Sequence, residues 1–210
     1  GLRASYSINN VGTLSGYGYW LDIPSNPASS SRTLGVRMAG ELPVGKGTTL
    51  LYAAEYARQQ DYGVNPNRYA LSCWLFEPGV KLGPVTAKAG FESLEGNVSV
   101  ALQTPLATLH AFNGWADKFL TTPANGLRDI YADVAFKVPG KGALAGLTLR
   151  GAWHDYNSTR LGIDYGSEWD ALVSYPVHKK VTLTAKVARY EASAFATDTT
   201  KFWFQVEAKF

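Results

Sequence analysis

Asp129, Asp133, Arg150 and His154 are the residues whose types and spacing most directly suggest chemistry. The two aspartates stand four positions apart on one face of an alternating segment, and Arg150 and His154 stand four apart on one face of the next segment. On neighbouring antiparallel strands, opposite charges that face each other stabilise the pairing. We therefore expect a cross-strand ladder of ion pairs here, and the alternative is a cluster that binds a solute.

Metal binding and covalent catalysis have weaker support. The one cysteine and the three histidines show no ligand spacing. A hydrolase would require His154 with Asp155 or Asp133 and a serine, and the Gly-x-Ser-x-Gly elbow is lacking. We predict no metal site, no cofactor and no catalytic residue, so that an enzyme acting on lipid esters is only an alternative function.

Residues 96–126 form the longest connection between alternating segments and contain side chains too apolar to lie free in water. One interpretation is that this connection folds inward, with Asp117 and Lys118 lining a constriction and Trp115 and Phe119 forming its aromatic wall. The other is that the aromatic side chains only anchor the connection to the surrounding sheet. The remaining apolar residues of this connection are Leu106, Leu109, Phe112 and Leu120.

Strands must position these residues, because apolar and polar side chains alternate with period two along most of the chain. The last segment is the clearest, and only Trp203 breaks its alternation. In the segment 68–82 the alternation is ambiguous, and Pro78 with Gly79 suggests a bulge between two registers. We count about eleven strands: 2–8, 16–22, 34–42, 49–59, 68–82, 85–92, 129–138, 147–154, 170–177, 181–187 and 200–210.

The connections between these segments alternate in length. Tight turns at 9–12, 44–47, 83–84 and 177–180 and a longer one at 139–146 alternate with polar connections at 24–32, 61–68, 96–126, 157–164 and 192–199. This alternation is typical of a transmembrane β-barrel with short periplasmic turns and long external loops. Eleven is an odd number, whereas bacterial single-chain barrels have even numbers of strands. We therefore expect the 210 residues to be the C-terminal part of a larger barrel.

Composition and charge agree with a single outer-membrane barrel domain over residues 1–210. The chain is 46% hydrophobic, and its 20 basic and 17 acidic residues are dispersed, which argues against nucleic acid as a partner. A soluble sandwich would also alternate, but here aromatic residues gather near the expected strand ends, as in the interfacial girdles of membrane barrels. The expected girdle residues are Tyr17, Tyr19, Tyr56, Phe136, Trp153, Tyr165, Tyr175, Phe202 and Phe210.

Two segments carry a family resemblance. The end of the chain, Phe202-Trp-Phe-Gln-Val-Glu-Ala-Lys-Phe210, resembles the C-terminal β-signal read by the outer-membrane assembly machinery, and its signal residues would be Phe202, Phe204, Val206 and Phe210. Glu92-Ser-Leu-Glu-Gly96 and the region from Leu102 to Gly126 resemble porin-like proteins grouped with the proteobacterial alginate export family. This resemblance covers about 69–210.

The alginate-export resemblance implies a barrel of 14–18 strands in the bacterial outer membrane, through which a solute passes passively. A polyanion exporter should have a strongly basic lumen, whereas both signs of charge fall on the inward face expected here. We therefore expect a porin or channel for small polar or saccharide-like solutes, with a structural barrel of filled lumen as another alternative. The expected partners are outer-membrane lipid, lipopolysaccharide and the assembly machinery, and no subunit interface is evident.

Overall fold

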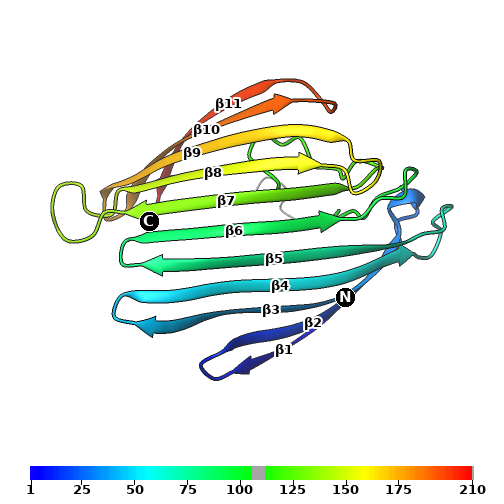
Figure 1. The fold of residues 1–210 in the computed structure, drawn as a ribbon, viewed down its shortest axis with the longest axis horizontal. Helices are drawn as coiled ribbons and strands as arrows, with labels where there is room; N and C mark the ends of the chain where they lie inside the picture. Colours follow the sequence, from blue (N-terminus) through cyan, green and yellow to red (C-terminus); the bar gives the residue numbers. More distant parts are fainter. Residues whose placement is uncertain (106–111, 210) are drawn as a thin grey trace.

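A computed structural model describes residues 1–105 and 112–209 and shows a single antiparallel sheet of eleven strands in chain order (Figure 1). Both the all-β class and the predicted number of strands are confirmed. The strands are β1 (Leu2–Ile8), β2 (Gly12–Leu21), β3 (Ser31–Gly45), β4 (Thr48–Asp61), β5 (Ala70–Leu82), β6 (Val85–Leu94), β7 (Leu127–Lys137), β8 (Thr148–Asn157), β9 (Asp164–His178), β10 (Val181–Ala192) and β11 (Thr199–Ala208).

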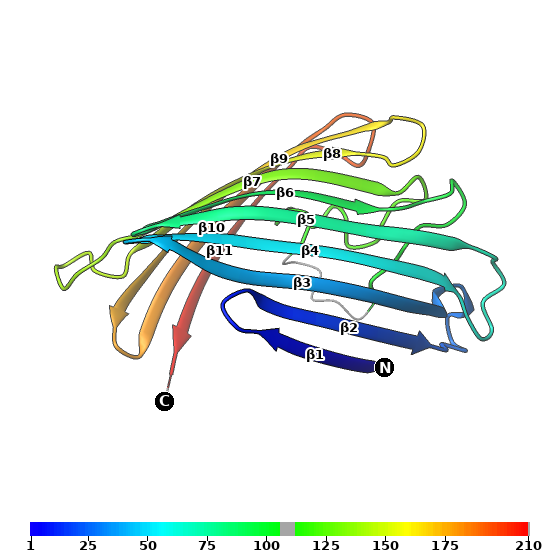
Figure 2. The same cartoon turned by 60° about the horizontal axis from the view of Figure 1, so that its bottom comes forward.

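The sheet curves strongly, and the β6–β7 connection lies on its concave side (Figure 2). Short turns join the strands at one end of the sheet, with the longer β7–β8 connection among them, and the long connections lie at the other end (Figure 1). We call these the short-turn end and the long-loop end. The predicted alternation of connection lengths is confirmed except at the β7–β8 connection, residues 138–147, which is longer than the connections 158–163 and 193–198 of the long-loop end. The β2–β3 connection contains a short 3-10 helix, Pro27–Ser29.

No helix in the described parts of the chain has the length and apolar character needed to cross a membrane.

The outward face of this sheet is apolar and its inward face is polar, which is the reverse of a soluble sandwich. On β7, Ile130 and Val134 are 42% and 51% exposed on the convex face, whereas Asp129 and Asp133 are 1% and 8% exposed on the concave face. A soluble sandwich buries its apolar face and hydrates its polar one. This sheet therefore requires an apolar environment outside and covers its polar side chains inside.

The expected bulge in the segment 68–82 is wrong. Strand β5 keeps one register with β4 from Gln60↔Ala70 to Thr48↔Leu82. Leu71 and Cys73 belong to the concave face even though they are apolar, because that face packs there against the β6–β7 connection. Apolar residues consequently occur on both faces of β5, which explains the ambiguous pattern.

Three expected girdle residues, Tyr17, Tyr19 and Tyr165, also lie on the concave side. Tyr17 donates a hydrogen bond to the Glu55 carboxylate, and Tyr165 is 2% exposed within the interior cluster. Trp203, the residue that broke the alternation of the last segment, faces inward as well and packs near Lys186. Phe210 lies outside the described residues, and the other expected girdle residues are on the convex face: Tyr56, Phe136, Trp153, Tyr175 and Phe202.

The hydrophobic core lies on the concave side, between the sheet and the β6–β7 connection. Burial of apolar surface is the main stabilising contribution to such a core. The connection supplies four members of this cluster, and inward residues of the strands and strand ends supply the rest. The buried members are Leu71, Leu94, Leu102, Trp115, Ala116, Phe119, Leu127, Tyr156, Tyr165, Ala188 and Tyr190.

Candidate functional site: an inner cavity under the sheet

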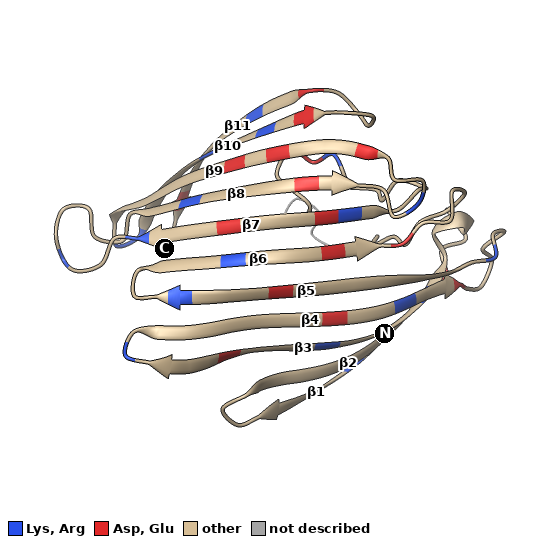
Figure 3. Cartoon of the chain, in the orientation of Figure 1, with Lys and Arg blue, Asp and Glu red and all other residues tan. Residues whose placement is uncertain are grey.

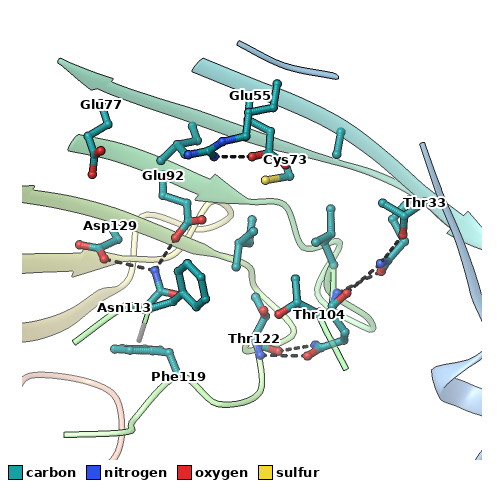
Figure 4. Close-up of a pocket in the computed structure, with 18 of the residues that line it drawn as sticks. Thr33, Glu55, Cys73, Glu77, Glu92, Thr104, Asn113, Phe119, Thr122 and Asp129 are labelled. Carbon is teal, nitrogen blue, oxygen red and sulfur yellow. Dashed lines mark hydrogen bonds and ion pairs between the residues drawn. The ribbon is translucent and has the colours of Figure 1, made fainter. Parts of the chain in front are cut away.

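A cavity of about 1060 Å³ lies on the concave face, lined by inward side chains of β1 to β8 and by residues of the β6–β7 connection. Strand alternation places every second residue of each strand toward this space. Figure 4 shows carboxylates from β4, β5, β6 and β7 around it, with Asn113 and Phe119 of the connection opposite them. The cavity therefore combines a charged wall with a wall made by the connection.

Paired glutamine side chains hold the first part of the connection against the sheet. Gln59, which is 2% exposed, donates a hydrogen bond of 2.8 Å to the Gln103 carbonyl oxygen and accepts one of 3.0 Å from the Gln103 amide. The Gln103 side chain in turn makes bonds of 2.8 and 3.0 Å with the backbone of Thr122. These bonds join the two ends of the connection to each other and to β4.

Four inward carboxylates hold the tip of the connection, and we call Glu92, Asp129, Glu168 and Asp170 the carboxylate seat. Asn113 donates to Glu92 at 2.6 Å and to Asp129 at 3.2 Å (Figure 4). Two backbone amides donate to β9, that of residue 116 to Glu168 at 2.6 Å and that of residue 115 to Asp170 at 3.3 Å. These four hydrogen bonds to inward side chains of β6, β7 and β9 fix the tip against the sheet.

The backbone of the tip adopts a conformation that few residues tolerate. Asn113, Gly114 and Asp117 have φ values of 52°, 80° and 60°, in the left-handed region. Asparagine, glycine and aspartate are the residue types that reach this region most readily. The sequence Asn113-Gly114 therefore allows the chain to turn so that its amides point at the carboxylates of β9.

Trp115 and Phe119 both line the cavity and are 7% exposed, while their role as the wall of a pore constriction stays a prediction. Phe119 stacks on Phe195 at 5.3 Å between ring centroids and packs against Tyr156 at 4.5 Å, so it anchors the connection to the strands. Trp115 lies under two cations, with Arg150 at 5.3 Å and Lys186 at 4.8 Å from its ring. Inward folding and anchoring, considered as alternatives from the sequence, occur together.

Asp117 and Lys118 are in a different place from the one expected. Asp117 forms an ion pair of 2.8 Å with Lys201, and Lys118 donates a hydrogen bond of 2.6 Å to the Thr199 hydroxyl. Both partners lie on β11, so these two residues fasten the connection to the last strand. Neither lies among the residues that line the inner cavity.

The cross-strand pairing of Asp129, Asp133, Arg150 and His154 is confirmed. Arg150 Nε lies 2.5 Å from Asp133 Oδ2, and His154 Nδ1 lies 3.0 Å from Asp129 Oδ2, each pair joining β7 to β8. His154 also stacks between Tyr131 and Tyr156, and the aspartate that it contacts is Asp129 rather than Asp133 or Asp155, the partners considered for a hydrolase.

Two more ion pairs continue the charged wall across the sheet. Arg37 and Glu55 join β3 to β4 at 2.6 Å, and Lys88 and Glu77 join β6 to β5 at 2.9 Å. Acidic and basic residues consequently lie on neighbouring strands across the middle of the sheet, with acidic residues on both β4 and β5 between the basic residues of β3 and β6 (Figure 3). Such paired charges offer both donors and acceptors to a polar molecule in the cavity, with little net field.

Two tyrosines complete this wall: Tyr131, which sequence reasoning did not identify, and Tyr17, which it assigned to the aromatic girdle. Tyr131 of β7 is paired with Gly90 of β6, and its ring passes over that glycine to donate a hydrogen bond of 2.7 Å to Glu77 of β5. Tyr17 of β2 passes over Gly35 of β3 to reach Glu55 of β4 in the same way. The signal is a tyrosine opposite a glycine on the inward face, which becomes visible only once the register is known.

A metal centre is not evident in the described residues, because no group of three or more histidine, cysteine or acidic side chains could hold an ion there. Cys73 points into the cavity from β5. The chemistry available to the cavity is therefore hydrogen bonding, ion pairing and contact with aromatic rings.

Comparisons with known proteins connect this geometry to outer-membrane barrels. No protein-family model matches the sequence, and no curated protein is similar to it in sequence. Among solved structures, the fold is similar to Pseudomonas aeruginosa OpdL (TM-score 0.73, 20% identity, covering 97% of this chain and 58% of OpdL). It is also similar to OprD, an outer-membrane protein of that organism (0.76, 16%, 97% and 57%), and to its OpdK (0.74, 16%, 98% and 55%).

At these identities the similarity shows the fold alone, and the chain spans little more than half the length of the structures it matches. The eleven strands thus have the fold of part of a larger outer-membrane β-barrel. Membership of the alginate export family has no support in these comparisons.

Proposed function

We propose that this chain is part of an outer-membrane channel through which small polar solutes pass passively. The observation that carries the proposal is the inner cavity, a space of about 1060 Å³ lined by paired charges and partly closed by a connection folded in from the long-loop end. Selectivity in channels arises from the diameter of the pore and from the polar groups that line it.

The membrane location is supported by the convex face. Strands β2 to β11 have 10 to 15 residues, enough for the ~9–11 residues that a tilted membrane strand requires. Their convex side chains are largely apolar and exposed, among them Phe76, Val134 and Phe204 at 59%, 51% and 72%. These side chains avoid water only in a lipid environment, so the bacterial outer membrane is the proposed location.

Lipid also requires that the sheet be closed, because unpaired backbone groups at a sheet edge are costly in hydrocarbon. In the described residues β1 and β11 each pair with one neighbour only. Eleven strands in 58% of the length of OpdL correspond to about 19 strands for a barrel of that whole length, and even numbers are the rule. A barrel of about 18 or 20 strands is therefore proposed, at or above the upper limit expected from the sequence.

The solute class follows from the lining. The cavity wall carries five acidic side chains and four lysine or arginine side chains, so it lacks the strongly basic surface that a polyanion such as a polyuronate needs. One of the similar structures, OpdK, was determined with vanillate. We propose solutes of about that size, or small saccharides, that exchange hydrogen bonds with the paired charges.

The last strand supports the proposed recognition by the assembly machinery. Phe202, Phe204 and Val206 lie on the convex face of β11 and are 77%, 72% and 58% exposed. An alternating apolar edge of this kind is accessible for recognition before the barrel closes. Phe210 lies outside the described residues, so its part in such a signal stays a prediction.

Single-channel recording of the full-length protein in planar bilayers tests the proposal. We expect steady openings, and a larger conductance when residues 106–120 are removed, because the connection occupies part of the lumen. Absence of channels from correctly folded protein would contradict the proposed function, and unchanged conductance after the deletion would exclude the connection as a constriction. A lipid-ester hydrolysis assay on the same preparation tests the alternative enzyme, for which we expect no activity.

A further inference from the structure

Four arginines form a row across the convex face of the sheet near the long-loop end, and we call this row the arginine ring. Arg32 of β3, Arg58 of β4, Arg128 of β7 and Arg189 of β10 alternate with inward residues and are exposed. In the described strands these four are the lysine and arginine side chains that point outward. Every other strand lysine or arginine belongs to the concave face, such as Arg37, which lines the cavity.

The strand registers place the four arginines at one depth. The cross-strand partners of each arginine lead along the registers to a position on the strand that carries the next one. The next arginine lies nearer the short-turn end than that partner position, by two residues from Arg32 to Arg58, by two from Arg58 to Arg128 and by four from Arg128 to Arg189. Eight residues over seven strands is about one residue a strand. With about 3.3 Å per residue and about 4.8 Å between strands, the line through them is inclined by about 35–40°, the strand tilt of membrane barrels.

Directly below the arginine ring, two residues toward the short-turn end, lies an aromatic girdle. Tyr56 packs on Trp74 at 4.4 Å and Trp153 lies 6.2 Å from Trp169, in both cases on the convex face. Aromatic girdles mark the boundary between hydrocarbon and headgroups. The arginine ring is therefore at the headgroup level of the leaflet at the long-loop end.

The guanidinium groups of the ring are available to a ligand. Arg128 makes no hydrogen bond or ion pair with any described residue. Arg58 has the Ser72 hydroxyl at 2.8 Å, and Arg32 donates one hydrogen bond to the Gln60 side chain, so each keeps further donors for a ligand. Arg189 has Glu191 at 3.0 Å, but its side chain stays 66% exposed, and such exposed pairs contribute little. Glu191 and Asp155 are the acidic side chains of the described strands on the convex face near this depth, so four arginines against two carboxylates leave the ring with an excess of positive charge.

The two ends of the sheet differ in the kind of cation they present. At the short-turn end the outer cations are lysines of the turns, Lys46, Lys141, Lys179 and Lys180. Arginine binds phosphate with a planar fork of donors, whereas lysine acts as a point charge. The arginine ring is present at just one end of the sheet. This asymmetry matches a bilayer in which one leaflet contains a phosphate-rich lipid.

We propose that the arginine ring binds the phosphate groups of a phosphorylated glycolipid of the lipid A type in the leaflet at the long-loop end. The inference rests on the proposed outer-membrane location but not on channel activity, because all four side chains point away from the inner cavity. It also fixes the orientation of the chain, with the long connections on the glycolipid side.

The test measures binding of bis-phosphorylated lipid A to the full-length protein in detergent micelles, by native mass spectrometry with titration. The variant R32Q/R58Q/R128Q/R189Q should bind at least tenfold more weakly than the natural protein. The matched control K46Q/K141Q/K179Q/K180Q removes the same charge from the other end and should stay within twofold. A four-arginine variant that keeps the natural affinity overturns the proposal.

Two further arms separate the sources of binding. Dephosphorylated lipid A should lose most of the affinity, and phosphatidylglycerol should bind several-fold more weakly than lipid A and depend less on the ring. Equal losses for lipid A and phosphatidylglycerol would instead identify a general anionic interface and overturn the glycolipid assignment. Folding of the glutamine variant is judged by heat-modifiable migration in gel electrophoresis. If that variant does not fold, the charge-preserving variant R32K/R58K/R128K/R189K replaces it and should bind lipid A several-fold more weakly than the natural protein. Natural affinity in the lysine variant overturns the proposal.

Conductance in a phosphatidylcholine bilayer distinguishes this inference from the proposed function. The arginine variant should conduct as the natural protein does, since the lumen is untouched. If the natural protein forms channels but does not bind lipid A, the proposed function holds and the lipid A site is contradicted. If it binds lipid A but forms no channels, the lipid A site holds and the proposed function is contradicted.

Discussion

Gly114 rests directly on the buried carboxylate of Glu168. A Cβ atom at position 114 would lie 2.6 Å from Glu168 Oε2 and 2.2 Å from the Tyr156 hydroxyl oxygen, and φ of this residue is +80°. Both the contact and the backbone conformation exclude a larger side chain. The tip of the β6–β7 connection therefore reaches the carboxylate seat only because glycine stands at this position.

We expect G114A to displace the tip, and to make the single-channel conductance larger and noisier than that of the natural protein. G140A is the matched control, because Gly140 has a similar φ of +88° but nothing within 4 Å of an added Cβ. The strain of an alanine in the left-handed region is then common to both variants. Indistinguishable recordings from the two would show that the contact with Glu168 does not hold the tip.

Phe119 should contribute most to docking of the connection. Its ring contacts Tyr156 and Phe195 and is 7% exposed, and truncation of a buried phenylalanine costs about 3–5 kcal/mol. We expect F119A to raise hydrogen exchange and protease cleavage across residues 112–122 while the strands stay protected. F112A should have little effect, because Phe112 is 56% exposed, and equal loss of protection in both variants would contradict this assignment.

Gly90 makes room for the ring of Tyr131. An added Cβ there would lie 2.0 Å from Cζ of that ring, so G90A must push the tyrosine off the wall and into the cavity. We expect a lower conductance and a barrel that unfolds at lower denaturant concentration. The control is G151A, where the nearest atom is 3.8 Å away, and it should match the natural protein. A normal conductance in folded G90A would mean that the Tyr131 side chain moves without entering the cavity, and it would contradict this prediction.

The strands were predictable because each has one face in an apolar environment, which imposes period two on the sequence. Prediction failed where the concave face is also apolar. Leu71 and Cys73 point inward against the β6–β7 connection, and Tyr165 is buried in the same cluster, so alternation alone could not assign their faces. The errors at these positions have one cause, a connection whose path is not encoded locally.

The candidate site was predictable only for contacts between adjacent strands. Asp129 with His154 and Asp133 with Arg150 followed from two neighbouring alternating segments. By contrast, Tyr131 reaches Glu77 across an intervening strand, which requires the register of three strands. The contact of Gly114 with Glu168 joins residues 54 apart and depends on the path of the connection.

The pair of Asp133 and Arg150 should control charge selectivity. The Arg150 side chain is 44% exposed to the cavity while that of Asp133 is 11% exposed, so the guanidinium faces the solute and the carboxylate neutralises it from behind. D133N leaves that positive charge unbalanced and should shift the reversal potential in a KCl gradient toward anions. R150Q should shift it toward cations, and the swapped variant D133R/R150D should return close to the natural value.

The dependence of these shifts on salt is the control. The Debye screening length shortens from about 10 Å at 0.1 M salt to about 3 Å at 1 M, so both shifts should shrink at high salt. Shifts that persist at 1 M KCl would point to an altered pore shape, because a steric change does not respond to screening.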